Sequence, residues 1–249
     1  MEIVFFNQVT TGLDSTKDKI VELSMVKIDS ISNKVVEKYN KKFNSNNVTI
    51  SDYTKIQLNI ESEDELSQYE NFSDNVDEIV DFIGDCALCC YNIKFNILFL
   101  YNELYKAGKI INLRNREIID PKLIYEQTIA NNFEGVYKHY MNEDYTETNN
   151  DSKVDAIINL YTKQKESGLE MNKENSEIYK TYIDINGYFK PVLNEDNKTD
   201  DIIFNFGKNI GKSIFSEVEY LKWMAGSNFP SDTVQYAIKF YNFAKSNKK

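Results

Sequence analysis

Lysine, glycine and aromatic residues near the end of the chain have the spacing of a phosphate-binding turn followed by a stacking surface. In the segment FGKNIGKS, Lys208 and Lys212 each follow a glycine. Glycine permits a tight turn, and such a turn can present both ammonium groups and backbone amides to a phosphate. Tyr220 and Trp223 follow on a predicted helix, where their rings can stack on bases. We therefore predict nucleic-acid binding by these four residues. The alternative is that Tyr220, Leu221 and Trp223 form the small core of this segment, which we favour for Trp223.

Two carboxylates stand four residues apart at the start of another predicted helix. Asp151 and Asp155 lie in the segment DSKVDAIINLY, so they share one helical face. Carboxylate oxygens are suitable ligands for a divalent cation, which makes a single cation site one interpretation. Acidic residues near a helix N-terminus also complement the helix dipole, and this is the interpretation that we favour.

The three cysteines are confined to one short apolar segment, CALCCYN. Cys86 and Cys89 have the C-x-x-C spacing of half a zinc site, but the chain has no second cysteine pair and only one histidine. Three neighbouring cysteines cannot build a disulfide framework. The segment therefore predicts a buried strand in which the thiols pack as small hydrophobic groups.

Length and composition predict a protein with a full hydrophobic core. The chain has 249 residues, of which 41% are hydrophobic, and this suits one medium domain with an appendage. No apolar run approaches the roughly 18–20 residues that cross a bilayer, so we expect no membrane association. We expect a cytoplasmic protein, or a virion protein if the source is viral. The abundance of Asn, Lys, Ile and Tyr suits an AT-rich genome, such as that of a phage or a low-GC bacterium.

Charge is distributed unevenly along the chain, whose net charge is −10. Residues 202–249 contain seven lysines and three acidic residues, a balance of +4. The preceding residues contain 22 basic and 36 acidic residues, a balance of −14. A polyanion such as nucleic acid should therefore meet the C-terminal segment first and be repelled by the remainder.

Hydrophobic periodicity predicts an α/β domain with a mixed sheet flanked by helices. Three strands separated by short turns predict an antiparallel meander at residues 2–6, 19–29 and 34–43. Helices and short strands alternate after the meander, which is typical of an α/β domain. The predicted helices cover residues 73–85, 92–109, 122–130 and 151–164, and the predicted strands cover the cysteine segment and residues 116–121.

Three segments resemble, in order and spacing, the motifs of the DnaQ-like 3′–5′ exonucleases of the DEDD superfamily. IVFFNQVTTGLDSTKDKIVELSMVKI is similar to the first motif, Asp-x-Glu-Thr-Thr-Gly followed by an Ile-x-Glu-Leu-type strand. YNIKFNILFLYNEL resembles the second motif, Asn-x-x-Phe-Asp ahead of a helix. NDSKVDAIINLY resembles the third, His-x-Ala-x-x-Asp on a helix. The resemblance covers residues 1–164 and implies a ribonuclease-H-like fold.

The same comparison shows that the catalytic positions are substituted. Asn7 stands at the first aspartate of the family, Val9 at its glutamate, Asn96 at its second-motif aspartate and Asn150 at its histidine, whereas Asp155 is retained. In the family, the four carboxylates hold two divalent ions that activate water and stabilise the leaving oxygen. Amides carry no charge to offset the dehydration of Mg²⁺, and valine offers no ligand. The resemblance therefore implies an inactive protein without a cofactor. Mg²⁺ or Mn²⁺ would be needed only for residual activity.

The C-terminal segment has a resemblance of its own. Residues 202–230 are similar to a small module appended to some bacterial and phage exonucleases, with a Phe-Gly-Lys-x-x-Gly-Lys turn, a Tyr-Leu-x-Trp-Met helix and a Phe-Pro before a last helix. We expect an exonuclease-like domain over residues 1–164, a polar linker over residues 165–201 and a small basic α+β module over residues 202–249.

These observations predict a catalytically inactive exonuclease-like protein that serves as a binding or structural module in a nucleic-acid-associated assembly. Its partner would be another protein or further copies of the chain, and the C-terminal module would supply any contact with nucleic acid. Two alternatives remain open. One is a single-stranded nucleic-acid-binding protein that uses the retained cleft or the basic tail, and the other is a residual metal-dependent 3′–5′ exonuclease with a rearranged site.

Overall fold

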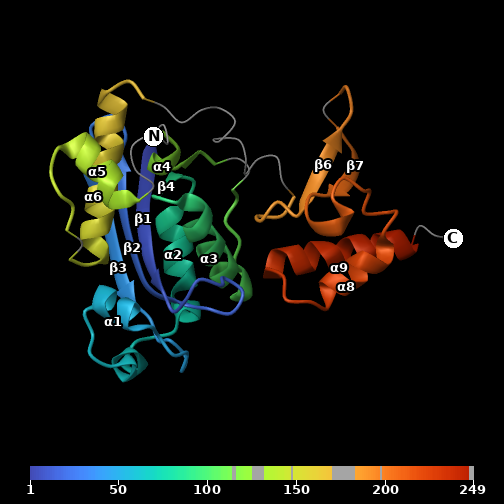
Figure 1. Cartoon of the computed structure of the whole chain (residues 1–249), viewed down its shortest axis with the longest axis horizontal. Helices are drawn as coiled ribbons and strands as arrows, with labels where there is room; N and C mark the ends of the chain where they lie inside the picture. The colour runs from blue at the N-terminus through green and yellow to red at the C-terminus, as the bar shows by residue number, and fades with distance from the viewer. Residues whose placement is uncertain (114–115, 125–131, 147, 170–182, 197, 247–249) are drawn as a thin grey trace. The chain divides into compact units, whose positions relative to one another are not determined.

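Residues 1–113, 116–124, 132–146, 148–169, 183–196 and 198–246 are described by a computed structural model. The chain divides into two compact units, Met1–Ser176 and Glu177–Lys249. A five-stranded mixed sheet lies between helices in the first unit, and the second unit pairs a two-stranded sheet with helices (Figure 1). The predicted α/β class is therefore confirmed for the first unit.

The sheet of the first unit has the strand order β3-β2-β1-β4-β5. β1 pairs antiparallel with β2, and β2 pairs antiparallel with β3, which confirms the predicted meander. β1 pairs in parallel with β4, and β4 pairs in parallel with β5. The strands are β1 (Glu2–Thr10), β2 (Ile20–Asp29), β3 (Val35–Lys42), β4 (Ala87–Cys89) and β5 (Ile118–Ile119).

Helices cover both faces of this sheet. α5 and α6 lie on one face, and α2 and α3 lie on the other (Figure 1). β1 and β2 are inner strands of the sheet and are buried over most of their length, as expected for strands covered on both sides. The helices of the first unit are α1 (Asp52–Leu58), η1 (Glu63–Gln68), η2 (Phe72–Asn75), α2 (Val76–Ile83), α3 (Ile93–Lys106), α4 (Pro121–Ile124), α5 (Phe133–Met141) and α6 (Asn150–Glu166). The rest of the helix predicted over residues 122–130 lies outside the described residues.

The turn after β1 is held by one aspartate. The Thr11 hydroxyl and the Asp14 amide both donate to the Asp18 carboxylate, at 3.1 and 2.8 Å. A Cβ atom at Gly12 would stand 2.4 Å from that carboxylate, so the turn needs glycine there. A short turn between the first two strands is therefore present, as predicted.

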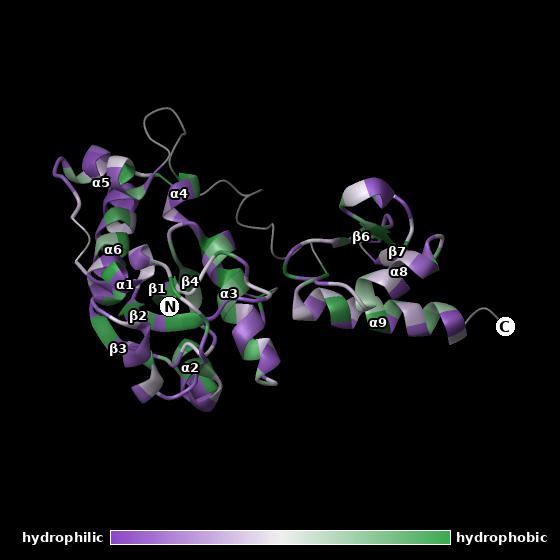
Figure 2. Ribbon diagram, turned by 60° about the horizontal axis from the view of Figure 1, so that its bottom comes forward, coloured by the Kyte–Doolittle hydropathy of each residue, from purple (hydrophilic) through white to green (hydrophobic). Residues whose placement is uncertain are grey.

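The second unit begins earlier than predicted. β6 (Phe189–Leu193) and β7 (Thr199–Phe204) form an antiparallel hairpin, and they are followed by η3 (Gly207–Asn209), α8 (Val218–Ala225) and α9 (Ser231–Ser246). The side chains of Phe189 and Phe204 are fully buried in one core with residues of α8 and α9. In Figure 2, apolar and polar residues alternate along α9, as suits a helix that packs on one side. The predicted linker over residues 165–201 thus contains a strand that this core requires, which corrects the boundary at residue 202.

The corrected boundary also changes the charge of the C-terminal part. Residues 177–249 contain ten lysines and nine acidic residues, a balance of +1 in place of +4. Among the described residues, no helix combines the length and apolarity that a membrane crossing requires.

Candidate functional sites

A row of polar side chains crosses three strands of the first unit. Asn7 of β1 is the register partner of Ser24 of β2, and Ser24 is the partner of Asn40 of β3. Partners in register project from the same face of a sheet, so the three side chains are neighbours. The first residues of α6, Asn150 and Asp151, contact the two ends of this row, which we call the polar row.

Asn7 and Asn150 satisfy each other at one end of the polar row. The Asn7 Nδ2 donates to Oδ1 of Asn150 at 2.7 Å, and the Asn150 Nδ2 donates to the backbone carbonyl of Asn7 at 3.2 Å. Asn150 is only 2% exposed. The structure therefore brings together two of the substituted positions and joins them by hydrogen bonds.

Asn40 organises the other end of the polar row. Its Nδ2 lies 2.6 Å from the Ser24 hydroxyl, 2.8 Å from Oδ1 of Asp151 and 3.2 Å from Oε1 of Glu22. Burial raises the pKa of the Glu22 carboxyl, and the charge of Asp151 adds to this effect. Sequence analysis did not select Glu22 as a site residue, although a glutamate between apolar residues of a predicted buried strand was a usable signal.

Val9 lies in an apolar cluster. Its side chain is 3% exposed and belongs to a hydrophobic cluster with Val21, Ile50, Leu58 and Leu66, which come from β2 and from the segments around α1 and η1. This position is therefore part of the packing between the sheet and α1.

Asn96 and Asp155 also have separate surroundings. The buried Asn96 amide donates to the backbone carbonyls of Tyr91 and Asn92, at 3.2 and 3.3 Å. Asp155 has a side chain 57% exposed and lies 3.9 Å from the ammonium of Lys38. Asp151 and Asp155 thus meet different residues of β3. Among the described residues, no group of three or more His, Cys, Asp or Glu side chains is placed to hold a metal ion.

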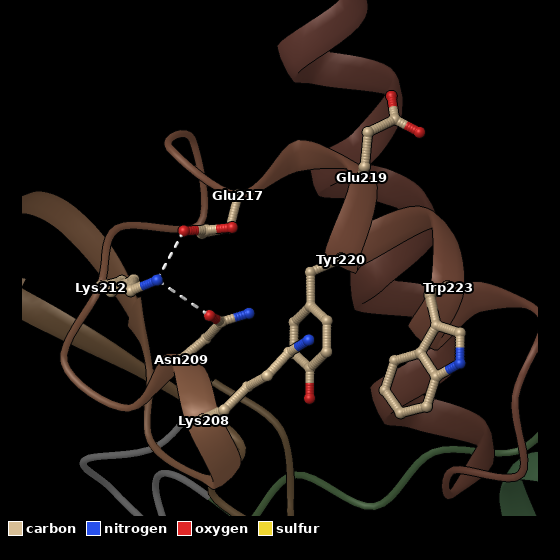
Figure 3. Close-up of a pocket in the computed structure, with 7 residues that line it drawn as sticks. All are labelled: Lys208, Asn209, Lys212, Glu217, Glu219, Tyr220 and Trp223. Carbon is tan, nitrogen blue, oxygen red and sulfur yellow. Dashed lines mark hydrogen bonds and ion pairs between the residues drawn. The ribbon is translucent and has the colours of Figure 1, made fainter.

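The second unit contains a pocket that collects all four predicted nucleic-acid-binding residues. Its volume is about 760 Å³, and its walls come from η3, the turn that follows η3, and α8 (Figure 3). The lining residues are Lys208, Asn209, Lys212, Glu217, Glu219, Tyr220 and Trp223. We call it the C-terminal pocket.

The two lysines of the C-terminal pocket differ in their partners. The Lys212 ammonium lies 2.7 Å from Oε1 of Glu217 and 3.1 Å from Oδ1 of Asn209 (Figure 3). Lys208 is exposed, and its ammonium lies 5.8 Å from the centre of the Tyr220 ring. Lys208 has no carboxylate partner among the described residues, so its charge is available to a ligand.

The glycine turn is present, but three of its amides already have acceptors within the unit. Gly207 and Gly211 have φ values of 60° and 79°, the left-handed conformation that the predicted turn requires. The amides of Ile210, Gly211 and Lys212 donate to backbone carbonyls within the same unit, at 3.3, 2.8 and 3.0 Å. Internal hydrogen bonds occupy these three donors, so these amides would not contribute to the predicted phosphate cradle.

The aromatic residues form an exposed stack. The rings of Tyr220 and Trp223 are 5.0 Å apart at an interplanar angle of 20°. Trp223 is 53% exposed, whereas its neighbour Leu221 is fully buried in the core of the unit. The prediction that Trp223 belongs to the small core is thus wrong, whereas the same prediction for Leu221 is confirmed. Leu221 and Met224 fill the inner side of α8.

Solved structures of nucleases share the fold of the first unit. One is cell-death related nuclease 4, at a TM-score of 0.55 and 12% identity, with 68% of this chain and 64% of that chain covered. Another is Escherichia coli Exonuclease I in complex with a dA16 oligonucleotide, at a TM-score of 0.52 and 13% identity, with 72% and 42% covered. A third is a 3′-exonuclease that recognises the 3′ end of histone mRNA stem-loop, at a TM-score of 0.52 and 14% identity, with 69% and 85% covered.

These likenesses establish the exonuclease fold that the three motifs predicted. The matched region spans less than two thirds of the first two nucleases. No protein-family profile matches the sequence, and no curated protein sequence is significantly similar to it.

Proposed function

We propose that this chain is an exonuclease-fold protein that does not cleave nucleic acid and that serves as a binding or structural module in a nucleic-acid-associated assembly. The observation that carries this proposal is the reciprocal hydrogen bonding of Asn7 and Asn150. The motif resemblance places a metal-binding aspartate and a catalytic histidine at these positions. Two amides that satisfy each other supply neither an anionic ligand nor a base near neutral pH.

The residues at the other metal-ligand positions do not fit a pair of divalent ions. Val9 has no ligand atom and contributes to an apolar cluster. The Asn96 amide is turned toward backbone carbonyls, and Asp155 faces Lys38. Mg²⁺ needs anionic oxygen ligands in nearly octahedral geometry to offset the loss of its water. Together with Asn7, these positions offer one carboxylate, the exposed Asp155, which supports the absence of metal-dependent chemistry.

A rearranged metal site at the polar row has little support. Glu22 and Asp151 adjoin the row, but the Nδ2 group of Asn40 lies between them and is within hydrogen-bonding distance of both. The Asn40 N–H group therefore lies where a cation bound by both Glu22 and Asp151 would have to lie. The raised pKa of Glu22 also reduces its value as a ligand, because metal binding requires the ionised carboxylate.

Binding of single-stranded nucleic acid is a second candidate function. It is favoured by the convergence of Lys208, Tyr220 and Trp223 in the C-terminal pocket. An available cation beside an exposed aromatic ring, here that of Trp223, is the usual composition of a surface that binds single strands. This function is compatible with the first, because the pocket belongs to the second unit and needs no catalytic residue.

Digestion of an end-labelled single strand with Mg²⁺ or Mn²⁺ tests the proposal. We expect the strand to remain intact. Metal-dependent shortening that is lost in the Asp155→Ala variant would contradict the proposal. Co-purification from the native source then identifies what the module binds.

A further inference from the structure

We infer that the C-terminal pocket binds one unpaired nucleotide of a single strand, with the base against Trp223 and the adjacent phosphate at Lys208. The inference rests on the second candidate function and gives it a site, a ligand class and a division of roles between residues.

The base would stack on a platform whose orientation is fixed. Tyr220 is half-buried and packs edge-on against Phe204, with ring centres 5.2 Å apart at an angle of 78°. Phe204 is fully buried, so the core of the unit holds Tyr220 in place. Trp223 stacks on Tyr220 and meets Phe229 edge-on, with ring centres 5.6 Å apart at 85°. A preorganised ring that is 53% exposed can stack on a base without first being ordered.

The phosphate would meet a single lysine. Figure 3 shows the Lys208 side chain extending over the Tyr220 ring, which lies between Lys208 and Trp223 in this view. Lys212 is already neutralised by Glu217. Glu219 points away from Lys208 in the same view, and its carboxylate lies 3.6 Å from the Lys245 ammonium. Because the carboxylates of Glu217 and Glu219 are paired with lysines, they repel a phosphate at Lys208 less strongly.

The ligand should be unpaired, because stacking needs an exposed base face, and the faces of paired bases are covered by their neighbours in a duplex. The net charge of residues 177–249, +1, gives little general attraction for a polyanion. Stacking must therefore supply much of the affinity, and the salt dependence should be shallow, with a slope of about 0.7 for one phosphate contact.

The chain contains its own probe, because Trp223 is its only tryptophan. The full chain is titrated with a single-stranded oligonucleotide, with an abasic strand of equal length, and with the corresponding duplex. We expect the single strand to quench the Trp223 fluorescence, and the other two to quench it little. DNA and RNA strands are compared to distinguish the two possible sources of the nucleotide.

Variants then separate the two roles, with anisotropy of a labelled strand as the readout. Trp223→Ala should lower the affinity roughly 5- to 150-fold, which corresponds to the loss of one stacked base. Lys208→Ala should lower the affinity and reduce the salt slope by about 0.7. Lys222→Ala is the matched control, since it removes an exposed lysine of α8 outside the pocket. Near-ultraviolet circular dichroism of the lysine variants verifies that the unit stays folded.

Three results would overturn the inference. Equal quenching by the abasic strand would show that no base stacks on Trp223. Strand binding that survives both Trp223→Ala and Lys208→Ala would place the contact elsewhere on the chain. Failure of every strand to bind would overturn the inference and the second candidate function together. The proposed lack of cleavage would be unaffected, because the digestion assay tests it independently.

Discussion

Asn7 and Asn150 lie 143 positions apart in the sequence, and their side-chain amides are joined by a hydrogen bond of 2.7 Å. This contact fastens the start of α6 to the central strand β1. Because each amide satisfies the other, replacement of either one leaves a group in the protein interior without its partner.

Asn7→Asp should therefore destabilise the first unit. The aspartate loses the Nδ2 donor, and its carboxylate faces the Asn150 carbonyl oxygen unless the Asn150 amide reorients. We expect the free energy of unfolding to fall by roughly 1–3 kcal/mol, the usual cost of an unsatisfied buried group. Urea unfolding followed by far-ultraviolet circular dichroism measures this change. Asn150→His in the same background supplies a new donor and should recover part of the loss. A fully stable Asn7→Asp variant would show that the contact contributes little.

Val9→Glu should be more damaging. The new carboxylate would enter the apolar cluster around Leu58 and Leu66, on the strand position opposite the buried Glu22. An unpaired buried charge typically costs roughly 3–5 kcal/mol, less if the group takes up a proton. The loss should therefore shrink as the pH falls. Val9→Gln is the matched control, because it has nearly the same shape as glutamate without the charge. If Val9→Glu and Val9→Gln lose equal stability at every pH, charge burial is not the cause.

A variant that carries the motif residues at all four substituted positions, 7, 9, 96 and 150, would also place a glutamate in the apolar cluster at position 9. The carboxylate at position 9 must displace the packing between β1 and α1 before it can bind a metal ion. In the proposed inactive protein, the residue at this metal-ligand position therefore contributes to core packing.

Acidity should stabilise the second unit. Burial, with help from the nearby Asp232 charge, raises the pKa of Asp184 from 3.8 to about 6. Both side chains are 2% exposed, and Asp184 accepts hydrogen bonds from the Phe189 amide and the Thr233 hydroxyl. The folded unit holds a proton on Asp184 more tightly than the unfolded chain does. The stability that protonated Asp184 contributes to the second unit is therefore fully present below about pH 4. This contribution is lost as the pH rises through about 6.

The effect can be measured through Trp223 fluorescence during urea unfolding. Between pH 7 and pH 5 we expect the free energy of unfolding of the second unit to increase by roughly 1–2 kcal/mol. Asp184→Asn should flatten this dependence. If the free energy of unfolding decreases as the pH falls from 7 to 5, the raised pKa of Asp184 does not control the stability of the second unit.

The boundary of the second unit can be tested with fragments. A fragment of residues 202–249 lacks β6 and the buried Phe189, whereas residues 177–249 contain the whole hairpin. We expect the longer fragment to keep the near-ultraviolet circular dichroism of Trp223 and to unfold cooperatively. The shorter fragment should lose both properties. Cooperative unfolding of the shorter fragment would mean that the hairpin is dispensable.

The sequence predicted the fold of the first unit because its signals are local. Runs such as EIVFF and the helical spacing of Val154, Ile157 and Ile158 define elements directly, and the substituted positions could be found from their neighbours. Val9 was identified as lacking a ligand atom, but its cluster depends on Ile50, Leu58 and Leu66, which only the folded chain brings together.

The second unit was less predictable because polar residues conceal its core. Phe189 lies in a short segment, YFKPVL, that is followed directly by the polar run NEDNKTDD. Asp184 is buried and accepts a hydrogen bond from Thr233 of α9, 49 positions away. The ion pair of Lys212 with Glu217 depends on the turn geometry, which no local pattern specifies. The glycine spacing did predict the turn itself, since positive φ values favour glycine.

Release of labelled 3′-terminal nucleotides from single-stranded DNA and RNA tests the central claim most directly. The wild-type protein and the Asp155→Ala variant are purified in parallel and assayed with Mg²⁺ and with Mn²⁺, so that a contaminating nuclease acts equally in both preparations. The account predicts that the two proteins release nucleotides at the same background rate with either metal. A metal-dependent rate in the wild-type protein that disappears in Asp155→Ala would contradict the account and would show that the chain is an active exonuclease with a rearranged site.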